Sequence, residues 1–317
     1  MQIIITGGAG FLGQKLAKAL LENLIDFDEL LLVDINLPTA PRPDERIKCL
    51  QADLSDPGIT NSIIRPDTGI VYHLAAILSS HAEKDFDLGW KINLDITKQL
   101  LETCRHNCPG ARFIFASSLA VYGGTLPEVV NDMTALTPRS SYGIQKAMGE
   151  LLVNDYTRKK FVDGRVLRLP TISVRPGKPN LAASSFVSSI IREPLHGEET
   201  ICPVDPGLGL WLASPDTTIT NLIHAAQIDP DLLGNWRSIN LPGLGVTVRE
   251  MLNALEKIAG KSTVDLIQFK PDPAISNIVS TWPGRIDNEP ALKLGFRIDH
   301  RFEDIITQFI NSEKGLG

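Results

Sequence analysis

The chain has 317 residues, of which 43% are hydrophobic and 21% are charged, a composition typical of soluble globular proteins. Its formal net charge of -6, with no basic block, argues against nucleic acid or an anionic membrane surface as the main partner. No hydrophobic run reaches the ~18 residues that a membrane-spanning helix needs, and no charged leader precedes the first predicted strand, so we expect a cytoplasmic protein.

Strands and helices alternate through the first half of the chain. A continuous β-branched run predicts a buried strand at Gln2–Thr6. Leucines at four-residue intervals then mark one face of a helix, at Leu16, Leu20 and Leu24. Further strands are predicted at Leu30–Asp34, Ile47–Asp53, Gly69–Ala76, Ala111–Ser118 and Gly164–Pro170, with long helices at Asp87–His106 and from Ser141 past Tyr156. This alternation predicts an α/β fold with a doubly wound parallel sheet covered on both faces.

The pattern loosens after Pro170, where prolines and glycines interrupt it. Two helices, Thr217–Gln227 and Val248–Ala259, and a short strand, Ser238–Leu241, are still predicted. We therefore expect a nucleotide-binding domain of residues 1–169, to which residues 213–242 return. Residues 170–212 and 243–317 are expected to form a smaller α/β lobe that binds substrate over the carboxyl edge of the sheet.

Three glycines, Gly7, Gly10 and Gly13, follow the first predicted strand and open the first predicted helix. Such a series permits a tight turn, close approach of the backbone to a pyrophosphate, and packing of the helix on the sheet. The amino terminus of the helix offers N–H groups and a positive dipole end to the phosphates. A tight turn without a ligand is the alternative. The strand–turn–helix context favours a dinucleotide site, which would include Phe11 and Leu12.

The end of the second predicted strand indicates which dinucleotide is bound. Asp34 stands 21 residues after Gly13, where a carboxylate can accept hydrogen bonds from the ribose hydroxyls of adenosine. The same carboxylate would repel a 2′-phosphate, and no arginine follows before Arg42, so NAD is favoured over NADP. Asp53 and Leu54, which end the third predicted strand, are placed to meet adenine; a strand-end cap is the alternative.

Tyr142 and Lys146 lie four residues apart in a predicted helix and therefore share one face. A cation beside a phenol favours the phenolate and lowers the pKa of tyrosine from about 10. The result is a proton acceptor near neutral pH, which the oxidation of an alcohol requires. Ser118, at the end of a central strand, can donate a hydrogen bond to a substrate oxygen. An exposed helix face and a turn cap are the alternatives; the presence of the glycine series favours catalysis.

The chain shows no pattern of metal ligands. Its four cysteines form no Cys-x-x-Cys pair and its six histidines have no ligand spacing, so we expect reduced structural thiols and no metal site. His73 lies in a hydrophobic strand and is expected to be a core residue.

Taken together and in this order, these motifs resemble the extended short-chain dehydrogenase/reductase family, whose nucleotide-binding domain has the Rossmann fold and binds NAD. The resemblance covers nearly the whole chain. It is carried by the glycine series, Asp34, Asp53-Leu54, Val71-Tyr72-His73-Leu74-Ala75-Ala76, Asn93, Ser117 to Gly123, Tyr142 to Lys146, and Arg285 to Phe296.

The resemblance implies a role for individual residues. Tyr142 is the general acid/base, and Lys146 binds the nicotinamide ribose while tuning Tyr142. Ser118 steadies the reacting oxygen, and Asn93 supports a water relay through a local distortion of its helix. Further cofactor contacts are implied at Leu74, Ala75, Ala76, Thr171 and Ile172.

Other positions separate the reactions found in this family. Dehydratases carry Asp-Glu after the active serine, but here Leu119-Ala120 cannot transfer protons. Epimerases of nucleotide sugars usually hold the diphosphate with arginines, and none lies between Arg249 and Arg285. A dehydrogenase is therefore favoured.

A small acidic substrate is suggested by polar residues after the fourth and sixth predicted strands. Arg175 could clamp a substrate carboxylate, although a solvated arginine is the alternative. The predicted substrate-binding residues are Ser79, Ser80, Ser118, Tyr142, Thr171 and Arg175. A following loop offers further polar groups for a small ligand, at Ser184, Ser185, Ser188, Ser189 and Arg192.

Within the family, residues 169–180, 182–186 and 210–215 resemble the D-erythronate dehydrogenase branch. This implies NAD-dependent oxidation of the C2 hydroxyl of a small sugar acid, D-erythronate to 2-oxo-tetronate (2-dehydro-D-erythronate), with Tyr142 as base. A nucleotide-sugar 4-epimerase with tightly bound NAD is the rival, and a non-catalytic dinucleotide sensor is more remote. The resemblance also implies a homodimer formed by the helices Asp87–His106 and Ser141–Tyr156; the alternative is that loops cover the outward hydrophobic faces of these helices.

Overall fold

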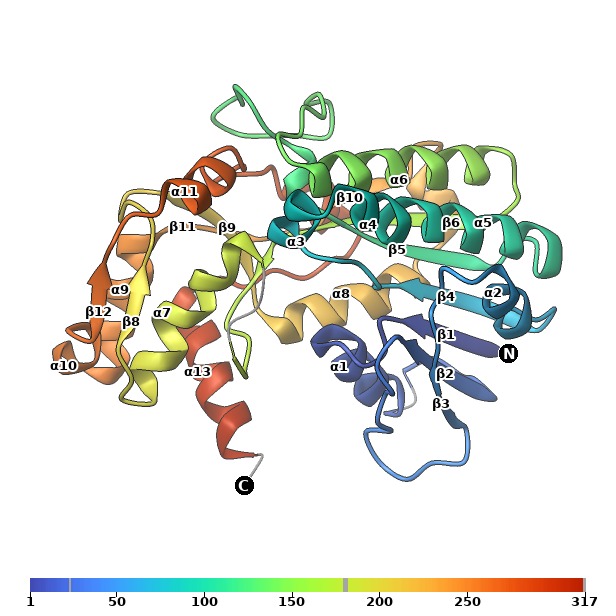
Figure 1. The fold of residues 1–317 in the computed structure, drawn as a ribbon, viewed down its shortest axis with the longest axis horizontal. Helices are drawn as coiled ribbons and strands as arrows, with labels where there is room; N and C mark the ends of the chain where they lie inside the picture. Colours follow the sequence, from blue (N-terminus) through green and yellow to red (C-terminus); the bar gives the residue numbers. More distant parts are fainter. Residues whose placement is uncertain (23, 179–181, 316–317) are drawn as a thin grey trace.

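The structure, a computed structural model, describes residues 1–22, 24–178 and 182–315. At the centre of its seven-stranded parallel sheet, β1 (Gln2–Thr6) lies beside β4 (Thr68–His73) (Figure 1). From this pair the strands extend in opposite directions, so that the order is β10 (Ser238–Asn240), β6 (Asp163–Leu169), β5 (Arg112–Ser118), β4, β1, β2 (Glu29–Asp34), β3 (Ile47–Gln51). The predicted doubly wound α/β fold is confirmed, and each predicted strand forms within a few residues of its expected bounds.

Helices cover both faces of the sheet (Figure 1). Because side chains of a strand alternate between faces, Ile3 and Ile5 enter one hydrophobic core and Ile4 enters the other. The first core is closed by α1 (Phe11–Leu20) and α8 (Pro215–Gln227), and the second by α2 (Pro57–Ile63), α5 (Ile96–Asn107) and α6 (Ser141–Arg158).

The helix predicted at Asp87–His106 is not uniform. The structure divides it into α4 (Phe86–Trp90), a π-helical turn η1 (Lys91–Asp95) and α5. A short helix, α3 (Ser79–Lys84), precedes it and was not predicted. The π-helical turn contains Asn93, where the family resemblance implied a distortion.

A third hydrophobic core lies among the elements beside the large sheet, which stand on the left in Figure 1. It contains two small sheets, formed by β11 (Leu244–Thr247), β9 (Gly209–Ala213) and β7 (Thr171–Ile172), and by β12 (Ile267–Phe269) and β8 (Thr200–Cys202). The helices around it are α7 (Phe186–Leu195), α9 (Val248–Ala259), α10 (Lys261–Val264), α11 (Pro273–Val279) and α13 (Phe302–Lys314), with α12 (Glu289–Lys293) between α11 and α13 in the chain.

The limits of the two predicted domains, 1–169 with 213–242 and 170–212 with 243–317, remain a prediction. Among the residues that the structure describes, no helix combines the length and hydrophobicity needed to cross a membrane.

Candidate active site

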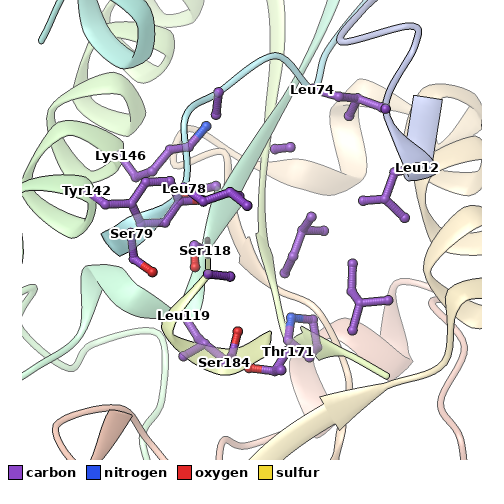
Figure 2. A pocket seen from close by; sticks show the side chains of 18 of the residues that line it. Leu12, Leu74, Leu78, Ser79, Ser118, Leu119, Tyr142, Lys146, Thr171 and Ser184 are labelled. Carbon is purple, nitrogen blue, oxygen red and sulfur yellow. The ribbon is translucent and has the colours of Figure 1, made fainter. Parts of the chain in front are cut away.

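A cavity of about 410 Å³ opens where the central strands of the large sheet end (Figure 2). Its walls come from the turn after β1, the ends of β4, β5 and β6, the start of α6, and residues beyond the large sheet such as Ser184 and Trp282. The sequence-predicted residues in its lining are Gly7, Gly10, Phe11, Leu12, Gly13, Leu74, Ala76, Ser79, Ser118, Tyr142, Lys146, Thr171, Ile172 and Arg175.

The turn between β1 and α1 has no room for side chains at its glycines. Gly7 has φ +74°, and a Cβ on it would lie 2.9 Å from the backbone nitrogen of Ala75. A Cβ on Gly13 would lie 2.3 Å from the carbonyl oxygen of Gly7. Gly10 is the N-cap of α1, and no side chain caps the helix there. The turn therefore presents bare backbone and a helix amino terminus to the cavity, which fits the pyrophosphate of a dinucleotide.

Asp34 adjoins this turn but does not line the cavity. Its Oδ2 accepts a hydrogen bond from the backbone N–H of Ala9 at 3.1 Å, and its Oδ1 accepts one from that of Asn36, also at 3.1 Å. The half-buried carboxylate is thus held at the end of β2, beside the glycine turn.

Asp53 and Leu54 lie just beyond the end of β3. Asp53 is exposed, and its Oδ1 accepts a hydrogen bond from the N–H of Ser55 at 2.9 Å. This contact agrees with the alternative interpretation of Asp53 as a cap at the end of the strand. Hydrogen bonds with Ser55, first with its side chain and then with its N–H, lower the pKa of Asp53. Leu54 is buried in the core under α2 and α5. Their contact with adenine remains a prediction.

Asn93 is buried in the π-helical turn and binds protein through its amide. Its Oδ1 accepts from the N–H of Ile77 at 2.9 Å, and its Nδ2 donates to Oε1 of Gln145 at 2.8 Å. Asn93 therefore ties the segment after β4 to α6, the helix that carries Tyr142 and Lys146. A role in a water relay remains a prediction.

His73, at the end of β4, is the core residue that the sequence predicted. Its Nδ1 lies 2.8 Å from Oγ1 of Thr6 and its Nε2 lies 3.0 Å from Oγ1 of Thr97. Burial, followed by the charge of Lys146, lowers the pKa of His73 to about 3, so the imidazole is neutral at physiological pH.

Helix α6 lies very close to the end of β5 because two of its residues are glycines. A Cβ on Gly143 would lie 2.1 Å from the carbonyl oxygen of Ala120, and one on Gly149 would lie 2.7 Å from the ring of Phe115. The close packing brings the first turn of α6 against the end of β5. As a result, Ser118, Tyr142 and Lys146 all face the same cavity (Figure 2).

Burial dominates the protonation of Tyr142 and Lys146. It raises the pKa of Tyr142 to about 12, while a hydrogen bond with Ser118 acts in the opposite direction. It also lowers the pKa of Lys146 to about 7, against the charge of Glu150. The Nζ of Lys146 lies 4.6 Å from the ring centroid of Phe115 and 5.8 Å from that of Tyr142.

The expectation that Lys146 lowers the pKa of Tyr142 is therefore wrong for the protein without ligands. Burial disfavours the charged phenolate and is the largest influence on the pKa of Tyr142. The two residues nevertheless share the predicted face and line the same cavity.

Glu150 joins α6 to β6 through a buried ion pair. Its Oε2 lies 2.7 Å from Nη2 of Arg168, and its Oε1 accepts a hydrogen bond from Oγ of Ser117 at 2.5 Å. Glu150 and Arg168 were not recognised in the sequence, because each reads as an ordinary charged position in its helix or strand.

Arg175 and Ser79, two further predicted substrate residues, also line the cavity. Arg175 is half-buried, and burial, assisted by the charge of Arg192, lowers its pKa. Ser79 is buried, and its Oγ accepts a hydrogen bond from the N–H of Ala183 at 3.1 Å. Ser80 lies outside the lining. Within the described part of the chain, no aspartate or glutamate lines the cavity, whose basic side chains are those of Lys146 and Arg175.

Several polar residues that were predicted to contact a ligand do not line the cavity. Ser188, Ser189 and Arg192 are buried in α7 and hydrogen-bonded to protein, so the expectation that they face a ligand is wrong. Ser184 does line the cavity. Trp282 also lines it and was missed as a site residue, because only the tertiary fold brings it there.

Comparison with known proteins places these motifs in context. Residues 3–209 match the model of the NAD dependent epimerase/dehydratase family. The chain is 55% identical to a D-erythronate dehydrogenase of Haemophilus influenzae, over 98% of this chain and 99% of that protein. It is 50% identical to a D-erythronate dehydrogenase of Cupriavidus necator, over 98% of each.

A solved structure with a similar fold is described as a nucleoside-diphosphate-sugar epimerase from Agrobacterium tumefaciens. The two chains are 41% identical. Their match covers 99% of this chain and 95% of the epimerase chain, with a TM-score of 0.94.

Proposed function

The chain belongs to the NAD dependent epimerase/dehydratase family of extended short-chain dehydrogenases/reductases, and from this premise we propose that it oxidises the C2 hydroxyl of D-erythronate to 2-dehydro-D-erythronate. It is an NAD-dependent oxidoreductase. The observation that carries the choice of substrate is the lining of the cavity, which includes Arg175 together with Ser118, Tyr142 and Lys146 and, among the described residues, no aspartate or glutamate. The identities of 55% and 50% to D-erythronate dehydrogenases support the same choice.

The fit of NAD follows from the residues around the cavity. The bare glycine turn would hold the pyrophosphate, Asp34 the adenosine ribose, and Lys146 the nicotinamide ribose. When bound, NAD supplies the acceptor for a hydride.

The protein's own residues would then handle the proton and the orientation of the substrate. Tyr142 accepts the proton of the C2 hydroxyl, and Ser118 steadies the same oxygen by a hydrogen bond. Lys146 in its charged form opposes the effect of burial on the pKa of Tyr142. Arg175 pairs with the substrate carboxylate through two parallel N–H···O bonds and so fixes C2 relative to Tyr142. The products are the 2-oxo acid, reduced cofactor and one proton.

The test is to measure NADH formation with D-erythronate and with other aldonates and uronates of four to six carbons, and to identify the product. We expect NADH formation with D-erythronate and a C2 ketone in the product. Absence of NADH formation with every sugar acid would reject the proposal.

A nucleotide-sugar 4-epimerase is the second candidate, because a similar structure with 41% identity is described as a nucleoside-diphosphate-sugar epimerase. Such an enzyme must hold a diphosphate, usually with arginines, and Arg175 is the sole arginine in the cavity lining among the described residues. Interconversion of UDP-sugars without release of NADH would favour the epimerase. A dinucleotide sensor is less favoured, since it has no need of Ser118, Tyr142 and Lys146 together.

A further inference from the structure

Arg175 is held by α7 at both of its backbone polar groups. Its N–H donates to Oγ of Ser188 at 3.0 Å, and its carbonyl oxygen accepts from Nη1 of Arg192 at 2.7 Å. Ser188 is 2% exposed and Arg192 is 5% exposed, and neither lines the cavity, whereas Arg175 does. Two buried side chains thus form hydrogen bonds with the main chain of Arg175, the residue whose own side chain lines the cavity.

Arg192 is itself held by two neighbours on α7. Its Nη2 lies 2.6 Å from Oε1 of Glu193, and the same nitrogen donates to Oγ of Ser189 at 3.4 Å. The charge of Arg192 is therefore balanced by a neighbouring carboxylate. No such ion pair is formed by Arg175 with any residue that the structure describes. Among the described residues, Arg175 in the cavity lining thus has no acidic partner, whereas the buried Arg192 next to it is paired with Glu193.

Burial and the nearby charge of Arg192 both disfavour the positive charge of Arg175. An anion in the cavity would restore the balance, since a carboxylate can accept two hydrogen bonds from a guanidinium group. The strength of such a bidentate pair depends on its geometry, and the geometry depends on the main chain from which Arg175 extends.

We propose that Ser188 and Arg192 are positioning residues that hold the main chain of Arg175 so that its guanidinium group binds the carboxylate of the substrate. The inference rests on the proposed function, because it assumes a carboxylate substrate. It separates two groups of residues: Arg175 contacts the ligand, and the pair on α7 acts only through Arg175. Loosening the pair weakens binding of the acid and leaves binding of an uncharged analogue unchanged.

The test compares two variants, Ser188→Ala and Arg192→Lys, with the wild-type enzyme. Ser188→Ala removes the acceptor for the N–H of Arg175, and Arg192→Lys keeps a cation but loses the forked donor. For each protein, KM and kcat with D-erythronate are measured, together with the dissociation constant of D-erythronamide, which lacks the charge. We expect KM for the acid to rise about tenfold, equivalent to roughly 1.4 kcal/mol, with kcat and the dissociation constant of the amide nearly unchanged.

Matched controls separate positioning from general loss of packing. Arg165→Lys changes a fully buried arginine that is paired with Asp163, and Ser238→Ala changes a buried serine of β10; neither residue lines the cavity. Both controls should keep the wild-type KM for the acid.

The possible failures are distinguishable. If the wild-type enzyme oxidises sugar acids but both α7 variants keep its KM, the inference is wrong while the proposed function stands. The same conclusion follows if acid and amide are weakened equally, because that outcome indicates a structural role. If the wild-type enzyme oxidises no sugar acid, the proposed function fails and the inference fails with it.

Discussion

At the scale of single residues, the proposed chemistry depends on a phenolate at Tyr142 and an ammonium group at Lys146, and burial disfavours both charged forms. Burial raises the pKa of Tyr142 and lowers that of Lys146, so the protein without ligands favours a neutral phenol and, above pH 7, a neutral amine. A positive charge beside the phenol would lower the pKa of Tyr142, and a negative charge near the amine would raise the pKa of Lys146.

Replacing Tyr142 by phenylalanine tests the assignment of the base. The variant keeps the ring that borders the cavity but has no group to accept a proton, so we expect kcat to fall by at least about a hundredfold with little change in the dissociation constant of NAD. Steady-state kinetics and titration of NAD measure the two quantities. Tyr156→Phe, on the same helix but hydrogen-bonded to Glu102, serves as the control and should remain active. Activity that survives in Tyr142→Phe would remove Tyr142 from the mechanism.

The depressed pKa of Lys146 predicts a dependence of stability on pH. The folded protein releases this proton near pH 7, whereas an unfolded chain holds it until about pH 10.4. Between these values the unfolded state binds more protons, so the free energy of unfolding rises with pH, by at most about 1.4 kcal/mol per pH unit from this residue. The penalty for burying the charge is greatest at and below pH 7 and disappears above pH 10.4.

Urea denaturation of the ligand-free protein at pH 7 and pH 9 measures this effect. The Lys146→Met variant, which keeps the length of the side chain without its charge, should lose most of the increase between the two pH values. Lys159→Met, at the exposed carboxyl end of α6, should keep it. Equal increases in the wild-type protein and in Lys146→Met would show that Lys146 does not titrate in this range.

At the scale of secondary-structure elements, the contact of α6 with the end of β5 sets the geometry of the site. In Gly143→Ala, the new Cβ would lie 2.1 Å from the carbonyl oxygen of Ala120, so the helix must move away. We expect a loss of about 1–3 kcal/mol in stability and a fall in kcat that exceeds the change in NAD affinity, because Tyr142 precedes this residue directly.

Gly315→Ala is the matched control for this prediction. Its Cβ would lie 3.5 Å from the nearest atom, the carbonyl oxygen of Asn311, at the end of α13. Thermal unfolding and steady-state kinetics of both variants provide the comparison. A normal kcat in Gly143→Ala would mean that α6 can shift without moving Tyr142 from its working position.

Elements whose cause is local could be predicted from the sequence, and those whose cause is tertiary could not. The central strands and α6 follow from hydrophobic periodicity, which a short window contains. The π-helical turn at Lys91–Asp95 has no such signature, because one extra residue per turn leaves the composition of a helix unchanged. The short strands β7 and β8 contain too few residues for a periodic pattern, and they are defined by their pairing with β9 and β12.

The candidate site divides in the same way. The glycine turn and the pair Tyr142 and Lys146 have spacings that their chemistry requires, so a pattern reveals them. The orientation of Arg192 depends on how α7 packs, and its residue type suggested a ligand contact where the structure has an internal one. Trp282 reaches the cavity through the fold of a segment far away in the chain.

At the scale of the whole molecule, the outer side of the first half exposes hydrophobic residues that a monomer would leave in water. On α6, Ile144 is 43% exposed and Leu151 is 56% exposed, and their spacing of seven places them on one face of the helix. Helix α4 lies beside α6 (Figure 1). On α4, Phe86 is 57% exposed, and its ring centroid lies 5.8 Å from that of Trp90. Single exposed residues of this kind are common, but here they gather on the helices that the family resemblance assigned to a homodimer.

We therefore expect the protein to sediment at twice the 34.7 kDa mass of the chain, with these helices paired across a two-fold axis. A two-fold interface brings each residue near its own copy or a close neighbour of it, so one acidic substitution introduces two like charges into the interface. Leu151→Glu should shift the protein toward monomers in sedimentation equilibrium, and added salt should partly reverse the shift because it screens the repulsion. Leu292→Glu, which adds the same charge at a 41% exposed position on α12, should leave the mass unchanged. A wild-type protein that sediments as a monomer, or a Leu151→Glu variant that remains dimeric, would place the interface elsewhere or remove it.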